Sequence, residues 1–223
     1  MNSYDKCIIL DFDCTIGYFR QIIYLINIIE KYYHLDNIED YEYFKIFDCY
    51  PNMFRPKIYD IFNLILSSKE KIKFFVLYTN NQNINFVSLI LQYIKIKLKY
   101  NDKLFDYTFF NTTKEKSLSF IKNNLNNSND EILFCYIDDS KNINMSNRLL
   151  QYVHCEKYIH NYNINEIINK FPFHSFHKIT KSRLHKYFLK YFEKIKTKTQ
   201  LPRSSFYSPS TKLLYVINLF IFS

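Results

Sequence analysis

Two carboxylates, Asp11 and Asp13, directly follow the apolar run "CIIL" that begins at Cys7. In an extended chain, side chains two residues apart point the same way, so both carboxylates would enter one pocket. Crowded carboxylates repel each other unless a cation or a proton lies between them. Because oxygen-only ligands favour a hard ion, this pair predicts a bound Mg²⁺.

Polar residues also follow two later apolar runs. Thr79 and Asn80 follow "FFVLY", and the pair Asp138 and Asp139 follows "ILFCYI". If the three runs are parallel strands of one sheet, their carboxyl ends lie at one edge, where ligands of such sheets bind. We therefore expect the polar residues after the three runs to form one site.

These residue types fit the two-step hydrolysis of a phosphomonoester. Attack of Asp11 on phosphorus would form an aspartyl-phosphate. Asp13 would protonate the leaving oxygen and later take a proton from water, a role that needs a raised pKa. Thr79, the backbone N–H groups that follow it from Asn80 onward, and a lysine would bind the phosphoryl oxygens.

The elements that must position these residues are apolar runs of strand length that alternate with segments of helical period. Because the runs are continuously apolar, both faces of each strand must be covered, which is typical of a parallel sheet between helices. We predict an α/β fold with a doubly wound, mostly parallel sheet and helices on both faces. The expected strands are 6–11, 72–78, 105–110, 132–138 and 152–155, and the expected helices are 20–33, 57–68, 83–98, 115–125 and 141–151.

Three motifs together resemble those of the haloacid dehalogenase superfamily of phosphohydrolases. "ILDFDCTIG" resembles the first motif, DxDx[TV]; "FFVLYTNN" resembles the second, an apolar strand ending in Ser or Thr; and "LFCYIDDS" resembles the fourth, an apolar strand ending in an acidic pair. The motifs occur in the family's order and span about residues 6–155. The resemblance implies a Rossmannoid fold and a Mg²⁺-dependent phosphatase.

Further segments resemble the branch that contains the RNA polymerase C-terminal-domain phosphatases and their NLI-interacting-factor-like relatives. These are "RPKIYDIF" at 55–62, "KSLSF" at 116–120 and "DDS" at 138–140. The position of "KSLSF" implies that Lys116 is the phosphate-binding lysine, with Lys114 as the alternative. Two departures leave the substrate open: Cys14 stands where Glu or Gly is usual, and "YTNN" replaces a "TAS"-like second motif.

The metal site is expected to use residues of the first and fourth motifs. Asp11, Asp138 and the backbone carbonyl of Asp13 would hold Mg²⁺, and Asp139 would support the site from behind or through water. Oxygen ligands of this kind suit Mg²⁺ better than zinc.

The chain has little room for the cap domains with which this superfamily selects small substrates. The 63 residues between Thr15 and Thr79 indicate two helices with a connecting loop, and Asn80–Lys116 indicates one helix and one strand. An uncapped or lightly covered site favours a phosphoprotein or another macromolecular substrate, and a small cap-like helical cover is the alternative. We predict a phosphatase domain at 1–172, a basic amphipathic helical extension at 173–200, and a linker with an apolar tail at 201–223.

The predicted helical extension has two interpretations. One apolar stripe runs along it, and lysines occupy much of the remaining surface. The helix could pack on the domain, or its basic face could bind nucleic acid, an anionic membrane or another acidic partner. The final run, "LLYVINLFIF" at 213–222, could pack on the body, mediate self-association or stay disordered. The stripe consists of Leu184, Tyr187, Phe188, Tyr191, Phe192 and Ile195.

Composition narrows the setting in which the protein works. The net charge of +9 favours acidic partners. Five cysteines without CxxC spacing indicate reduced thiols, and we see no secretory signal, so we expect an intracellular protein of the cytoplasm or nucleus. No apolar run reaches the roughly 20 residues of a membrane-spanning helix. Many Ile, Asn and Lys residues with a single Gly are typical of an AT-rich genome, such as that of a large virus.

The sequence therefore predicts a Mg²⁺-dependent phosphatase that acts on a phosphorylated macromolecule, more readily protein than nucleic acid. Two alternatives remain. A polynucleotide-end phosphatase is supported only by the basic charge, and a non-catalytic binding protein of the same fold would not need Asp11, Asp13, Thr79 and Asp138 together.

Overall fold

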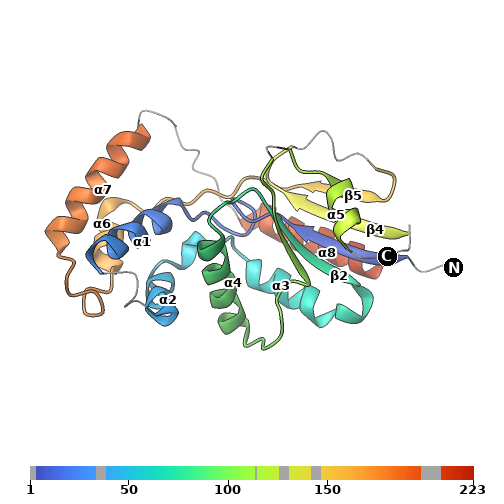
Figure 1. Ribbon diagram of the computed structural model, residues 1–223, viewed down its shortest axis with the longest axis horizontal. Helices are drawn as coiled ribbons and strands as arrows, with labels where there is room; N and C mark the ends of the chain where they lie inside the picture. Colours follow the sequence, from blue (N-terminus) through green and yellow to red (C-terminus); the bar gives the residue numbers. More distant parts are fainter. Residues whose placement is uncertain (1–3, 34–38, 114, 126–130, 142–146, 197–206) are drawn as a thin grey trace. The chain divides into compact units, whose positions relative to one another are not determined.

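The computed structural model describes residues 4–33, 39–113, 115–125, 131–141, 147–196 and 207–223. The chain falls into two compact units (Figure 1). Unit 1 comprises Met1–Gly17, Arg55–Ile159 and Phe206–Ser223, and unit 2 comprises Tyr18–Phe54 and His160–Ser205. These units do not follow the predicted boundaries at 172 and 200, because Tyr18–Phe54 groups with the residues after His160.

Unit 1 contains one sheet of five strands in the order β3-β2-β1-β4-β5. All neighbouring strands are parallel, which confirms the predicted α/β class. In β1, Cys7 pairs with Phe74 of β2 on one side and with Phe134 of β4 on the other. The strands are β1 (Asp5–Leu10), β2 (Phe74–Thr79), β3 (Tyr107–Phe110), β4 (Ile132–Asp138) and β5 (Leu150–His154).

Helices cover both faces of this sheet, as the continuous apolar runs predict. On one face, Leu118 and Ile121 of α5 (Leu118–Asn124) pack with Cys7, Ile9 and other alternate strand residues. On the other face, Phe62 of α3 (Ile58–Ser67) lies edge-on to Phe75, with ring centroids 5.8 Å apart. Helix α3 also contacts α4 (Ile84–Leu98) and α8 (Tyr207–Phe222). The 3-10 turn η3 (Lys69–Lys71) leads into β2.

The apolar C-terminal run forms helix α8 rather than an unstructured tail. Leu213, Ile217 and Ile221 are buried in unit 1, and α8 packs against α3. The ammonium of Lys6 donates to the carbonyl of Ile221 at 3.0 Å. Of the three fates left open for this run, packing on the body is the one observed. The predicted linker at its start lies outside the described residues up to 206.

Unit 2 is helical and rich in aromatic contacts. The predicted connecting loop contains a helix, α2 (Asp40–Cys49), and a 3-10 turn, η2 (Pro51–Met53), so that prediction was wrong. The ring of Tyr50 lies 5.2 Å from that of Tyr162, and its hydroxyl donates to the carbonyl of Ile167. The remaining helices of unit 2 are α1 (Arg20–Tyr32), α6 (Ile164–Lys170) and α7 (Lys181–Lys196).

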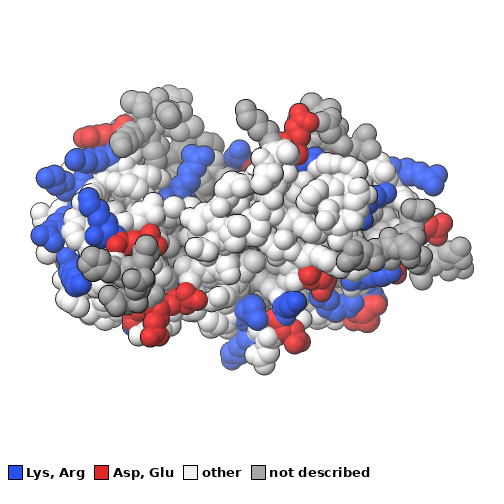
Figure 2. Space-filling view, in the orientation of Figure 1, with Lys and Arg blue, Asp and Glu red and all other residues white. Residues whose placement is uncertain are grey.

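Helix α7 is the predicted basic amphipathic helix, and its apolar stripe packs within unit 2. Leu184 and Phe188 are buried, and the Phe188 ring lies edge-on to Tyr24 of α1 at 5.3 Å. The opposite side of α7 stays exposed, and Figure 2 shows basic side chains gathered around it. Among the residues of α7 whose side chains are described, Lys181, Arg183, Lys186 and Lys190 are exposed.

Two further predictions concern single segments. The expected helix at 141–151 is not observed where the chain is described, because residues 147–149 are turn or extended and β5 begins at Leu150. Among the helices formed by the described residues, none has the length and apolar character required to cross a bilayer.

Candidate active site

The loop after β1 places two aspartates at the carboxyl edge of the sheet. The Asp11 N–H continues the sheet by donating to the Ile137 carbonyl at 2.9 Å. The chain then turns back tightly, because Cys14 adopts a left-handed conformation at φ 59° and its N–H donates to the Gly17 carbonyl. Asp11 is buried as a result, whereas Asp13 is only half-buried.

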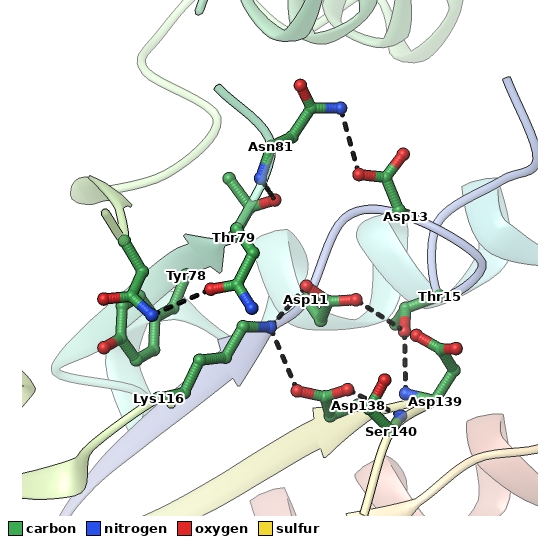
Figure 3. A network of polar contacts seen from close by, with 12 residues as sticks. Asp11, Asp13, Thr15, Tyr78, Thr79, Asn81, Lys116, Asp138, Asp139 and Ser140 are labelled. Atoms are coloured by element: carbon green, nitrogen blue, oxygen red, sulfur yellow. Dashed lines mark hydrogen bonds and ion pairs between the residues drawn. The ribbon is translucent and has the colours of Figure 1, made fainter. Parts of the chain in front are cut away.

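A buried lysine lies between two buried carboxylates in this site (Figure 3). The Lys116 ammonium lies 2.5 Å from Asp11 Oδ1 and 3.0 Å from Asp138 Oδ2. Asp11 follows β1 and Asp138 ends β4, and β1 lies between β2 and β4. The chain runs from β1 to β2 and β3 on one side of β1, and then crosses to β4 on the other side. The site lies at this reversal of strand order, where ligands bind in open parallel sheets. The predicted alternative, Lys114, lies outside the described residues.

A third carboxylate, Asp139, completes an acidic cluster. The Thr15 hydroxyl connects two of its members, donating to Asp11 Oδ2 at 3.3 Å and accepting from the Asp139 N–H at 3.1 Å. Carboxylate oxygens of Asp11, Asp138 and Asp139 lie within 4.8 Å of one another, a spacing that could hold a metal ion. In the described part of the chain, no other set of acidic, His or Cys side chains is arranged in this way. The donors are all oxygen, which fits Mg²⁺.

Asp138 is oriented by two further hydrogen bonds. Its Oδ2 accepts from the Tyr136 hydroxyl at 2.5 Å, and its Oδ1 accepts from the Ser140 N–H at 2.7 Å. Burial, followed by the neighbouring Asp138 charge, raises the pKa of Tyr136 above its usual range. The hydroxyl therefore stays protonated and remains a donor to Asp138.

The charges of the cluster shift one another's protonation. Burial is the main cause that raises the pKa of Asp11 from 3.8 to about 7; Lys116 opposes it and Asp138 adds to it. Burial alone would lower the pKa of Lys116, but Asp11 and Asp138 outweigh burial and raise it. The lysine is therefore charged, and the site favours additional positive charge beside its carboxylates.

Asn81, in the loop after β2, contacts both Asp13 and Thr79. The side-chain amide of Asn81 donates to Asp13 Oδ2 at 2.9 Å, and the Asn81 N–H donates to the Thr79 hydroxyl oxygen at 3.0 Å. Asn80 is exposed, and its side-chain oxygen accepts from Asn111 at 2.8 Å. Thus Asp11, Lys116, Asp138 and Asp139 form one buried cluster, and Asn81 links Asp13 to Thr79.

Sequence reasoning missed how Arg55 supports this site. Arg55 is 1% exposed, and its guanidinium donates to the carbonyls of Thr15, Cys14 and Glu156 at 2.6–2.7 Å. It therefore ties the Asp13-bearing loop to the chain after β5. The segment "RPKIYDIF" was identified only as a motif, and no contact of Arg55 was predicted from it. Asn81 was also missed, because one more Asn in an Asn-rich chain carries little signal.

This arrangement combines a buried carboxylate able to attack an electrophile, a half-buried carboxylate able to exchange protons with solvent, and a lysine able to bind an anion. Comparisons of the chain with models of protein families, with curated proteins and with solved structures found no match. The motif resemblance and the geometry of the site are therefore the basis for inferring a function.

Proposed function

We propose that the protein is a Mg²⁺-dependent phosphomonoester hydrolase that works through an aspartyl-phosphate on Asp11. The observation that supports this most strongly is the burial of Lys116 between Asp11 and Asp138 at the carboxyl edge of a parallel sheet. Fixed charges of both signs in such a place are costly for stability, and charged clusters that shift pKa values are typical of active sites. The resemblance to haloacid dehalogenase motifs supports the same reaction.

Asp11, Asp138 and the backbone carbonyl of Asp13 would hold the Mg²⁺, with Asp139 supporting them. When bound, the ion would offset the charge of the phosphoryl oxygens. Thr79, Asn80 and Lys116 would bind those oxygens from the other strands. Lys116 has three N–H donors, so it can keep its carboxylate contacts and still reach a phosphoryl oxygen.

In the first step, a carboxylate oxygen of Asp11 attacks phosphorus and the bond from phosphorus to the leaving oxygen breaks. Asp13 gives its proton to that oxygen, and the alcohol departs. In the second step, Asp13 takes a proton from water as the water oxygen attacks phosphorus. The bond from phosphorus to Asp11 breaks, which releases inorganic phosphate and restores both aspartates.

A macromolecular substrate, a phosphoprotein in the first place, remains part of the proposal. Its support is that Asn80–Lys116 contributes only α4 and β3 among the described residues, so no cap is inserted there. At the other cap position, after the first motif, Tyr18–Phe54 belongs to the helical unit 2. All five cysteines are free thiols, which supports a protein that works in a reducing compartment. The exposed lysines of α7 would suit an acidic partner.

The test is a phosphate-release screen with the purified chain. Phosphopeptides, DNA and RNA ends, nucleotides and sugar phosphates are each assayed with Mg²⁺ and with a chelator, and Asp11→Asn is the matched inactive control. We expect Mg²⁺-dependent release from phosphopeptides that Asp11→Asn lacks. Release from nucleic-acid ends alone would favour the polynucleotide alternative, and release from small metabolites alone would contradict a macromolecular substrate. No release from any class would contradict the hydrolase itself.

A further inference from the structure

Asn111 is a buried amide next to the site, and no step of the proposed reaction uses it. It follows β3 directly and is 8% exposed. Its backbone N–H donates to the Thr79 carbonyl at 2.7 Å, and its carbonyl accepts from the Gln82 side chain at 2.7 Å. The backbone of Asn111 is therefore fixed to the end of β2 independently of its side-chain contacts.

The side chain of Asn111 closes the loop that leads to Lys116. Its Nδ2 donates to the carbonyls of Thr113 at 2.8 Å and Glu115 at 3.2 Å. Its Oδ1 accepts from the Thr113 hydroxyl at 2.9 Å. The same Nδ2 also donates to the Asn80 side-chain oxygen at 2.8 Å, so one amide joins this loop to the loop after β2.

The contact with Glu115 bears directly on Lys116. The Glu115 carbonyl belongs to the peptide plane that ends at the Lys116 Cα, so fixing that carbonyl fixes where the lysine side chain begins. From there the ammonium must reach both Asp11 and Asp138. It lies 5.7 Å from the ring centroid of Tyr78 and 5.6 Å from that of Tyr136. A displaced Lys116 Cα would shift the ammonium relative to Asp11 and Asp138.

We propose that Asn111 is a positioning residue, which acts through the Glu115 peptide to hold the Lys116 ammonium between the two carboxylates. The inference deepens the proposed function and rests on it. It assigns Asn111 a part in binding the phosphoryl group without any contact between Asn111 and that group. Misplacing a reacting or binding group by about 1 Å can cost about 10²-fold in rate.

The test compares two substitutions at Asn111 with a control asparagine. Asn111→Ala removes all side-chain contacts. Asn111→Asp keeps the size of the side chain and the Oδ1 acceptor, but it replaces the Nδ2 donor with a second oxygen that faces three oxygen acceptors. We therefore expect Asn111→Asp to lose activity as Asn111→Ala does. Asn163→Ala is the matched control, because Asn163 caps α6 in unit 2 by accepting from the Glu166 N–H and belongs to no part of the site. Thr113→Ala, at an exposed position, weakens the same loop if the Asn111 variants fold poorly.

Two measurements separate positioning from general destabilisation. The first is kcat and KM for a phosphomonoester: we expect Asn111→Ala and Asn111→Asp to lose about 10- to 100-fold in kcat/KM, Thr113→Ala to lose less, and Asn163→Ala to keep wild-type values. The second is the rate at which an amine-reactive reagent labels each lysine, followed by mass spectrometry. Labelling of Lys116 should rise several-fold in the Asn111 variants, whereas labelling of Lys69 and Lys73 should not change.

Lys116 labelling and kcat/KM at wild-type values in Asn111→Ala would overturn the proposal, as would full activity of Asn111→Asp. If the wild-type chain hydrolyses no phosphomonoester, the proposed function fails, but the labelling rates still decide whether Asn111 holds Lys116 in place.

Discussion

The two edges of the sheet in unit 1 carry the same chemical pair in opposite surroundings. At the carboxyl edge, the side chains of Lys116, Asp11 and Asp138 are 4%, 8% and 1% exposed. At the amino edge, Lys73 pairs with Asp5 at 2.5 Å, but these side chains are 35% and 39% exposed. Lys69 and Asp106 form a second pair of this exposed kind. Distance does not distinguish the two edges; exposure does.

The difference in exposure supports the function proposed for the buried pair. Exposed pairs contribute about 0–1 kcal/mol and can arise without selection in a lysine-rich chain. In a buried pair, the free energy lost by removing both charges from water is about as large as their attraction. Apolar residues in the same place would therefore stabilise the fold as well or better. The charges at the buried edge therefore fit the proposed reaction, whereas the pairs at the exposed edge need no functional explanation.

The largest expected effect follows from removing the attacking charge. Asp11→Asn keeps the shape of the side chain but should abolish turnover, and Asp13→Asn should slow it by about 10²–10⁴-fold as general acid–base catalysis is lost. Phosphate release under Mg²⁺ measures both, and circular dichroism checks the fold. Wild-type turnover by Asp11→Asn would contradict the covalent mechanism. Asp5→Asn, at the exposed edge, should leave turnover unchanged.

Lysine substitutions sharpen the comparison in terms of stability. Lys116→Met leaves Asp11 and Asp138 buried without their cation, and breaking a buried pair in this way costs about 3–5 kcal/mol. Lys73→Met breaks an exposed pair and should cost about 1 kcal/mol or less. Urea denaturation at pH 8 with a chelator measures both free energies of unfolding. Equal losses would show that burial does not separate the two edges.

The pH dependence of stability should reflect the burial of Asp11 at the carboxyl edge. The pKa of Asp11 rises on folding from 3.8 to about 7, so the folded state binds a proton more tightly and loses stability as pH rises through this window. Asp11→Asn removes that loss. In chelator, its free energy of unfolding relative to that of the wild type should be greater at pH 8 than at pH 5. The upper bound of this change is about 3 kcal/mol, because about two pKa units of the shift lie above pH 5 and each corresponds to about 1.4 kcal/mol. A difference from the wild type that is the same at both pH values would contradict the raised pKa of Asp11.

The smallest expected difference lies within the buried edge itself. Asp138→Asn removes a proposed Mg²⁺ ligand, whereas Asp139→Asn removes a supporting group, whose loss typically weakens metal binding about 10- to 100-fold. We therefore expect a greater loss of Mg²⁺ affinity from Asp138→Asn, measured by calorimetric titration. Equal losses would reverse the ranking of the pair, and no loss from either variant would mean that the metal binds elsewhere.

The sheet could be predicted because buried parallel strands are continuous apolar runs, and all five were expected within a few residues of their observed bounds. Helix α2 was missed although Tyr43, Ile46 and Phe47 give it a buried face at helical spacing. Tyrosine and phenylalanine are so frequent in this chain that Tyr43 and Phe47 add little to a helical pattern. Helix α8 was missed because a run that is apolar on nearly every side has no helical period to detect.

The acidic residues of the site could be predicted because each follows a strand, and parallel strands bring their ends together. Arg55 and Asn111 could not be, because both act on backbone carbonyls. Because every residue has a backbone carbonyl, the sequence does not indicate which carbonyl a buried side chain will contact. Only the fold brings the Arg55 guanidinium to Cys14 and Glu156.

The hydrogen bond from Lys6 to Ile221 has a consequence for how the chain is made. The two residues are 215 positions apart. At about 5–20 residues per second, a ribosome needs roughly 10–40 s to add the partner after Lys6 has been made. Once α3 has been made, the face that α8 will cover remains open to other molecules for most of that time. A nascent chain of this protein should therefore depend on protection from aggregation until α8 emerges. Truncation within α8 should reduce the yield of soluble protein more than it disturbs the geometry of the candidate site.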